Sequence, residues 1–98
     1  MDIQELTVEM HHFVTKMGWY DQDSPKPQTP RNLATSLAIE AAEVLEHFQW
    51  EGVSISQESL ASELADVALY LLQLANETEI DLERAIMDKL QQNYGRSW

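Results

Sequence analysis

The chain has 98 residues, with 17 acidic and 6 basic side chains and a formal net charge of −11 at pH 7. This charge argues against binding of a phosphate backbone through a broad positive surface. Because the sequence has no cysteine, disulfides, zinc–thiolate sites and thiol catalysis are excluded, and any metal must be bound by oxygen or imidazole.

Apolar residues at helical spacing, with no alternating strand pattern, predict an all-α fold. The first helix is expected from about Asp2 to Met17, with Gly18 as a left-handed terminator. A loop containing two prolines follows. Thr29 is a suitable N-cap for a second helix over about residues 30 to 50, with Pro30 at its first position.

The remaining segments predict two more helices. Ser54 or Ser56 is expected to cap a third helix that lasts to about Asn76, and Asp81 a fourth that ends near Tyr94. We therefore expect one domain over residues 1–98, small enough that copies of the chain should associate. No apolar run approaches the roughly 20 residues that cross a bilayer, and the N-terminus lacks the form of a secretory signal, so a cytoplasmic protein is expected.

Acidic residues lie three apart on both central helices. On a helical wheel Glu40 and Glu43 border the apolar arc of the second predicted helix, and Glu63 and Asp66 border that of the third. Two such helices packed antiparallel would bring four carboxylates together. Arg31 is the only lysine or arginine in these segments, so a divalent cation is the natural compensating charge. Oxygen ligands suit Mg²⁺ or Mn²⁺.

The same wheels predict the residues that face the core. In the second predicted helix these are Leu37, Ala41, Val44, Leu45 and Phe48. In the third they are Leu64, Val67, Ala68, Leu71 and Leu74. Leu69 and Leu72 fall at or beyond the edge of the third helix's arc, which predicts a second apolar surface covered by another subunit.

The paired acidic motifs resemble a known family. Glu40-Ala-Ala-Glu43 followed by Glu63-Leu-Ala-Asp66 is similar to the E-x-x-E and E-x-x-D signature of the MazG-like nucleoside triphosphate pyrophosphohydrolases. Residues 30–50 look like the corresponding segment of dCTP pyrophosphatases and integron-type MazG proteins, and the resemblance covers about residues 13 to 94. It implies a four-helix MazG-like bundle that oligomerises through its helices. It also implies Mg²⁺-dependent cleavage between the α- and β-phosphates of a nucleotide, giving the monophosphate and pyrophosphate.

The resemblance also implies roles for individual residues. The four acidic residues would hold Mg²⁺, with Mn²⁺ as an alternative, and Lys89 and Asn93 would contact the triphosphate. Glu43 is favoured as the general base, although the sequence leaves this assignment open among the carboxylates. The implied cellular purpose is removal of unwanted nucleotides, with dCTP-like substrates.

Three aromatic residues, Trp19, Trp50 and Tyr70, match the order of the family's base-binding positions. Such rings stack on a nucleobase without reading its identity. The competing interpretation of Trp50 and Tyr70 is that they cap the edge of the core. Family members of this size form dimers or tetramers, and a homotetramer built as two dimers is expected here. Trp98 is interpreted as a subunit contact or a frayed end.

Two other functions compete with the enzyme. A carboxylate-bridged di-iron bundle needs two E-x-x-H motifs, and the chain offers only Glu9 to His12. A non-catalytic helical module could use its acidic surface to bind a basic partner. That interpretation explains the charge but not the paired spacing of the acidic residues.

Overall fold

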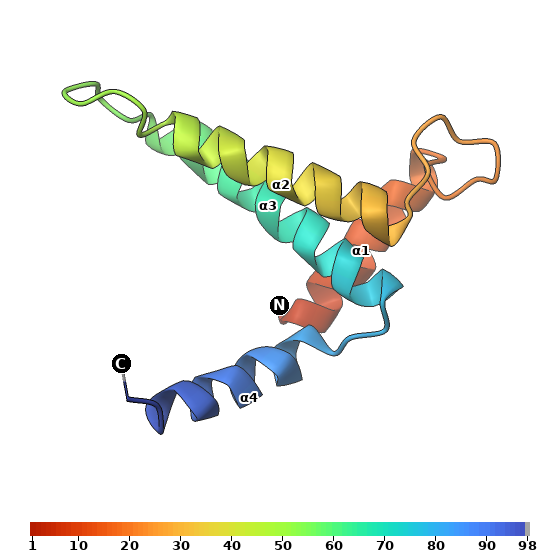
Figure 1. Cartoon of the computed structure of the whole chain (residues 1–98). Helices are drawn as coiled ribbons and strands as arrows, with labels where there is room; N and C mark the ends of the chain where they lie inside the picture. Colours follow the sequence, from red (N-terminus) through yellow and green to blue (C-terminus); the bar gives the residue numbers. More distant parts are fainter. Residues whose placement is uncertain (98) are drawn as a thin grey trace.

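The computed structural model describes residues 1–97, and Trp98 lies outside them. The described chain forms four helices and no strand (Figure 1). The helices are α1 (Ile3–Lys16), α2 (Pro30–Glu46), α3 (Gln57–Glu77) and α4 (Leu82–Tyr94). The all-α prediction is confirmed. None of the described helices is long and apolar enough to cross a membrane.

Side-chain caps fix where the helices begin. The Thr29 hydroxyl accepts a hydrogen bond from the backbone of Asn32, and the Asp81 carboxylate accepts one from Arg84, as the sequence predicted. Of the two serines that could cap α3, Ser56 takes that position. Gly18 follows α1 with a φ of 75°, which is the left-handed conformation expected of a terminator.

Helix α2 ends at Glu46, four residues before the predicted end. The backbone N–H groups of His47, Phe48 and Gln49 each bond a carbonyl three residues earlier, so the helix tightens before the turn. Gly52 then takes a φ of 77°. The chain therefore reverses through a loop from residue 47 to 56 and returns as α3.

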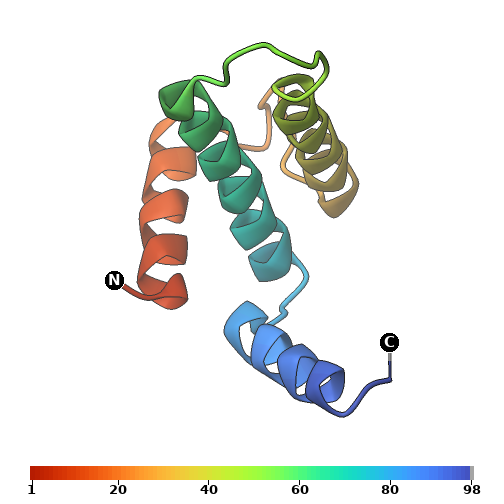
Figure 2. The ribbon, with the colours of Figure 1, turned by 90° about the vertical axis from the view of Figure 1, so that its left-hand side faces the viewer.

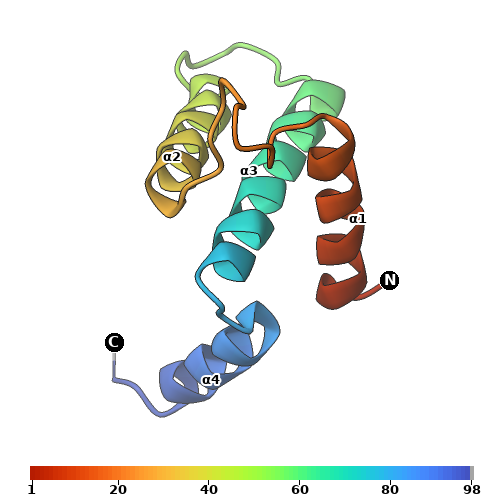
Figure 3. The same ribbon diagram turned by 90° about the vertical axis from the view of Figure 1, so that its right-hand side faces the viewer.

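Helix α3 is the central element, with α2 on one side and α1 on the other (Figures 2 and 3). Met10 and Val14 of α1 and Leu72 of α3 form the main buried cluster. Leu72 was expected on a surface covered by another subunit. That prediction was wrong, because α1 of the same chain covers it and leaves it only 8% exposed.

Of the ten residues predicted to face the core, four do so. Leu37 and Val44 of α2 and Val67 and Leu74 of α3 are partly buried, as expected. The other arc residues are exposed: Ala41, Leu45, Phe48, Leu64, Ala68 and Leu71. We call these six residues the apolar surface. Its larger side chains include Leu45, which is 69% exposed, and Phe48, which is 54% exposed. Helix α2 therefore turns the side that carries Glu40 and Glu43, and not the centre of its apolar arc, toward α3.

Helix α4 does not pack along α2 or α3 and projects from the end of α3 (Figure 1). Only Leu82, at its start, packs against the core cluster. The result is an open shape, with a radius of gyration of 16.0 Å, against about 13 Å for a compact chain of this length. A single copy is therefore not a closed bundle, and the predicted four-helix bundle is not completed within one chain.

Candidate active site

The four carboxylates of the paired acidic motifs are half-buried on α2 and α3, the two helices that pack together. Burial raises the pKa of Glu40. A hydrogen bond with Glu43 and the negative charges of Glu43, Asp66 and Glu63 raise that pKa further. The structure thus brings the other three carboxylates within electrostatic reach of Glu40. Asp66 and Glu63 approach Glu40 from the opposite helix.

Two oxygens of this cluster are buried and lack any hydrogen-bond partner: Oε2 of Glu40 and Oε2 of Glu63. An unpaired buried carboxylate oxygen is costly, and it calls for a proton, a donor or a cation. Within residues 1–97, however, no three side chains of the metal-binding types are arranged to hold one ion together. Mutual repulsion of carboxylates without a cation opposes such an arrangement. Carboxylate oxygens are therefore the right ligands for a hard cation, and two of them lack the hydrogen bond that would otherwise satisfy them. Their side chains would have to reorient to coordinate one ion together.

One imidazole belongs to the same cluster. His47 Nε2 lies 3.3 Å from Oε2 of Glu63, across the interface between the two helices. These side chains are 15% and 27% exposed. His47 follows Glu43 by one helical turn, so Glu40, Glu43 and His47 share one face of the chain.

A cavity of about 370 Å³ lies between α1 and α3. Its apolar lining comes mainly from α1 and from aromatic residues: Leu6, Met10, Phe13, Val14, Trp19, Leu69 and Tyr70. Three polar residues, Glu9, Asp66 and Gln73, complete the lining. Asp66 therefore belongs both to the acidic cluster and to the cavity wall. A ligand whose flat apolar part occupied the cavity would have its charged part beside the carboxylates.

Trp19 and Tyr70 also line a second hollow, formed by the loop between α1 and α2 and the start of α2. The ring of Trp19 meets Phe13 edge-on, with centroids 5.5 Å apart. Lys26 Nζ lies 5.0 Å from the centroid of the Trp19 ring, a cation–π contact. Trp19 is thereby held between the two hollows by contacts from both sides.

A polar network fixes the segment that carries Trp19. The Tyr20 hydroxyl is hydrogen-bonded to Nδ1 of His11. Gln73, which is only 3% exposed, donates from Nε2 to Oε1 of Gln28 at 2.6 Å. Burial, followed by the negative charge of Glu77, raises the pKa of Tyr20 although its hydrogen bond with Gln73 lowers it. The tyrosine therefore stays a neutral phenol at physiological pH, and the network links α1, the loop and α3.

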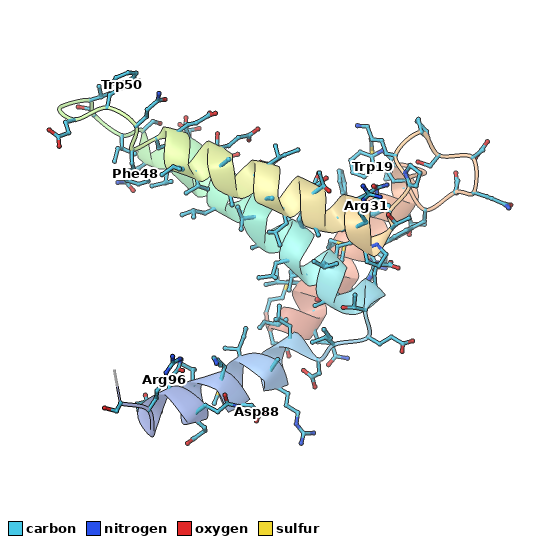
Figure 4. The ribbon with its side chains drawn as sticks, in the orientation of Figure 1. Trp19, Arg31, Phe48, Trp50, Asp88 and Arg96 are labelled. Atoms are coloured by element: carbon cyan, nitrogen blue, oxygen red, sulfur yellow. The ribbon has the colours of Figure 1, made fainter. Side chains whose placement is uncertain are left out.

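Three residues expected in the site are not brought to it by this chain. Trp50 is 69% exposed at the tip of the α2–α3 hairpin, at the opposite end from Trp19 (Figure 4). Lys89 is exposed, and Asn93 is half-buried with an unpartnered Oδ1. Both lie on α4, which stands apart from the two helices of the acidic cluster.

Sequence reasoning did not place Gln73 and Glu9 at the cavity or His47 beside Glu63. Gln73 follows Tyr70 by three residues and Asp66 by seven, so it continues the same stripe on α3. His47 follows Glu43 by four residues, so helical spacing alone places it beside that carboxylate. Glu9 had no such signal, because only the packing of α1 on α3 places it at the cavity.

Known proteins resemble this chain both in sequence and in fold. Residues 35–97 match the model of the MazG-like family. The chain is similar to dCTP pyrophosphatase 1 of Rattus norvegicus (33% identity) and of Homo sapiens (34% identity), each over 85 residues that cover 78% of this chain and 50% of that protein. The chain thus spans about half the length of these curated relatives. A solved pyrophosphatase from Archaeoglobus fulgidus DSM 4304 has a TM-score of 0.78 and 35% identity, covering 93% of this chain and 87% of that one.

Proposed function

The chain belongs to the MazG-like family, and on that premise we propose that it is a nucleoside triphosphate pyrophosphohydrolase. It cleaves between the α- and β-phosphates and releases a nucleoside monophosphate and pyrophosphate. The observation that carries the proposal is the position of Asp66, which lines an aromatic cavity and also interacts with Glu40 of the acidic cluster. That position gives one ligand a place for a ring and, beside it, a place for charged phosphates.

Glu40, Glu43, Glu63 and Asp66 would hold Mg²⁺, or Mn²⁺ in its place. The bound cation would neutralise phosphate charge and lower the pKa of an attacking water. The buried oxygens of Glu40 and Glu63, which accept no hydrogen bond, support this assignment. So does the raised pKa of Glu40, because a carboxyl group crowded by three others is the kind that a divalent cation would stabilise in its charged form.

The proton of the attacking water would pass to a carboxylate of the cluster. Glu43 is the favoured base. It is half-buried and hydrogen-bonded to Glu40, so it lies inside the acidic cluster and beside the carboxylates that would hold the metal. Asp66, which shares a wall with the cavity, would orient the α-phosphate near the ring.

The nucleobase would occupy the cavity between α1 and α3, stacked on Trp19 and Tyr70. Glu9 and Asp66 can only accept hydrogen bonds when ionised, and Nε2 of Gln73 already donates to Gln28. Hydrogen-bond acceptors in the cavity favour bases that carry an exocyclic amine, which supports dCTP-like substrates. The cellular purpose would be removal of unwanted nucleotides. A cytoplasmic location stays a prediction from the sequence.

A second copy of the chain would complete the site. The accessible surface is 7810 Å² for 11.3 kDa, about 2,100 Å² more than a folded monomer of this mass exposes. A standard interface takes roughly 800 Å² from each partner, so the excess suffices for more than one interface. This fits a homotetramer of two dimers joined through the apolar surface. Trp50, Lys89 and Asn93 of a neighbouring copy would then supply the remaining base and phosphate contacts.

The test is release of pyrophosphate from dCTP, dATP, dTTP and dUTP with and without Mg²⁺. Glu43→Gln and Asp66→Asn should lose activity while keeping their helical content by circular dichroism, and the exposed Glu46→Gln should remain active. Full activity of Glu43→Gln and Asp66→Asn would remove the carboxylates from the chemistry. A protein that released no pyrophosphate and gained no stability from Mg²⁺ would instead fit the non-catalytic acidic module.

A further inference from the structure

We infer that His47 is a metal ligand of the acidic cluster, so that the site accepts transition-metal ions such as Co²⁺ through a nitrogen donor as well as Mg²⁺ through oxygen alone. The inference rests on the proposed function, because it assigns a further ligand to the same cluster. The structural basis is the approach of His47 Nε2 to Oε2 of Glu63, at 3.3 Å.

This approach does not have the geometry of a hydrogen bond. Oε2 of Glu63 is buried and has no hydrogen-bond partner, although the imidazole nitrogen is close to it. The two atoms are therefore within ion-pair distance of each other without a hydrogen bond between them. Such an arrangement leaves both the nitrogen and the oxygen available to a third atom.

The separation agrees with two ligands of one ion. Metal–nitrogen and metal–oxygen bonds of first-row divalent ions and Mg²⁺ are about 2.0–2.2 Å long. Two ligands at that distance, with an angle of roughly 90° to 110° at the metal, lie about 3.0–3.4 Å apart. The observed 3.3 Å between His47 Nε2 and Glu63 Oε2 falls inside this range.

The position of His47 in the chain adds to the geometry. It is the C-cap of α2 and keeps helical backbone angles, with φ −62° and ψ −22°. It therefore continues the face that carries Glu40 and Glu43, and it meets Glu63 across the helix interface. Its side chain is 15% exposed, so the imidazole is largely shielded from water that would compete for its nitrogen.

A nitrogen donor changes which ions the site prefers. Mg²⁺ is bound almost entirely through oxygen, whereas affinity of nitrogen-containing sites rises along the first transition row from Mn²⁺ to Cu²⁺. Loss of His47 should therefore weaken Co²⁺ binding far more than Mg²⁺ binding. Removing a single supporting residue of a metal site typically costs about 10–100-fold in affinity.

The experiment is a calorimetric titration of untagged, nucleotide-free protein with Co²⁺ and separately with Mg²⁺. His47→Leu should bind Co²⁺ at least about tenfold more weakly than wild type, with its Mg²⁺ affinity little changed. His47→Gln, which keeps a polar side chain, is the second variant in case the leucine perturbs folding. His12→Leu is the matched control, since His12 is exposed on α1 and lies outside the cluster.

X-ray absorption at the cobalt edge identifies the ligand directly. The Co²⁺-loaded wild type should show the multiple scattering of one imidazole, and His47→Leu should lose it. An unchanged ratio of Co²⁺ to Mg²⁺ affinity in both His47 variants, equal loss of both ions, or an all-oxygen Co²⁺ shell in wild type overturns the inference while leaving the carboxylate site intact. Failure of wild type to bind either ion overturns the inference and the proposed metal site together.

Discussion

Replacing Glu40 with Gln should have opposite effects on the metal-free and the metal-bound protein. Oε2 of Glu40 is buried without a partner, and its carboxyl group is crowded by Glu43, Glu63 and Asp66. Glutamine keeps the shape, removes the charge and adds an N–H donor that can reach a neighbouring carboxylate. The substitution therefore relieves repulsion when no cation is present, and it removes a ligand when one is.

The magnitude follows from the burial of this group. An unsatisfied buried polar group costs about 1–3 kcal/mol, and because Glu40 is only half-buried the lower end applies. A gain of about 1 kcal/mol raises the melting temperature of a domain this size by roughly 4–8 °C. Mg²⁺ at about 100 times its Kd should stabilise wild type by roughly 2.7 kcal/mol, and this stabilisation should be lost in Glu40→Gln.

The assay is thermal unfolding followed by circular dichroism, in EDTA and in saturating Mg²⁺, at one fixed protein concentration because subunit association also affects stability. Glu46→Gln is the control, since Glu46 is exposed near the end of the same helix and should change neither value. A melting temperature of Glu40→Gln that is equal to or below that of wild type in EDTA would refute the reasoning about repulsion. Retention of the full Mg²⁺ effect would refute the assignment of Glu40 as a ligand.

Three further predictions concern pH, association and backbone strain. The pKa of Glu40 is raised above its ordinary value of 4.5, so the stability that this group contributes is present below pH 4.5 and is lost as pH rises through the folded-state pKa. In EDTA the melting temperature of wild type, relative to that of Glu40→Gln, should therefore fall as pH rises across this window. A difference in melting temperature that stays constant would contradict the raised pKa. Leu45→Glu should reduce the molar mass measured by light scattering, whereas Val8→Glu, on α1, should not, and an unchanged mass for Leu45→Glu would remove the apolar surface from the subunit interface. Glu79 follows Thr78, the C-cap of α3, and has a φ of 59°, and the next N–H, that of Ile80, bonds the carbonyl of Ala75 at 2.8 Å. Glu79→Gly should therefore stabilise the protein by up to about 1 kcal/mol in urea unfolding. Destabilisation would show that the glutamate side chain contributes more than its strained backbone costs.

The helices were predictable because their signals are local. Thr29 and Asp81 cap α2 and α4 by bonding backbone groups three residues away, and Gly18 supplies a conformation that other residues avoid. Each of these features depends on a few neighbouring residues. The end of α2 was predicted too late because residues 47–50 continue its helical pattern, while the loop that follows reverses the chain.

The direction in which α2 faces α3 was not predictable in the same way. The buried stripe of α2 is centred near Leu33, Glu40 and Val44, about 70° away on the wheel from the centre of the predicted arc. A helical wheel reports how much of a helix is apolar, but it does not divide that surface between its own chain and another. The residues wrongly predicted to be buried within the chain are therefore those of the apolar surface, which one copy leaves exposed.

The four carboxylates of the acidic cluster could be predicted from the sequence, but the position of His47 beside Glu63 could not. Spacing of three placed Glu40 with Glu43 and Glu63 with Asp66, and the packing of α2 on α3 brought the pairs together. The contact of His47 with Glu63 depends on which residues of the two helices lie opposite each other, which no local pattern specifies. The same holds for the cavity, since it requires α1 to lie against α3.

Product analysis after incubation with dCTP and Mg²⁺ in ¹⁸O-labelled water tests the proposed activity most directly. Attack of water on one phosphorus breaks the bond that joins the α- and β-phosphates. It should give deoxycytidine monophosphate and pyrophosphate in equal amounts, with ¹⁸O in one of the two products, with no reaction in EDTA and none by Asp66→Asn. Formation of deoxycytidine diphosphate and inorganic phosphate, or turnover that persists in EDTA, would contradict the account.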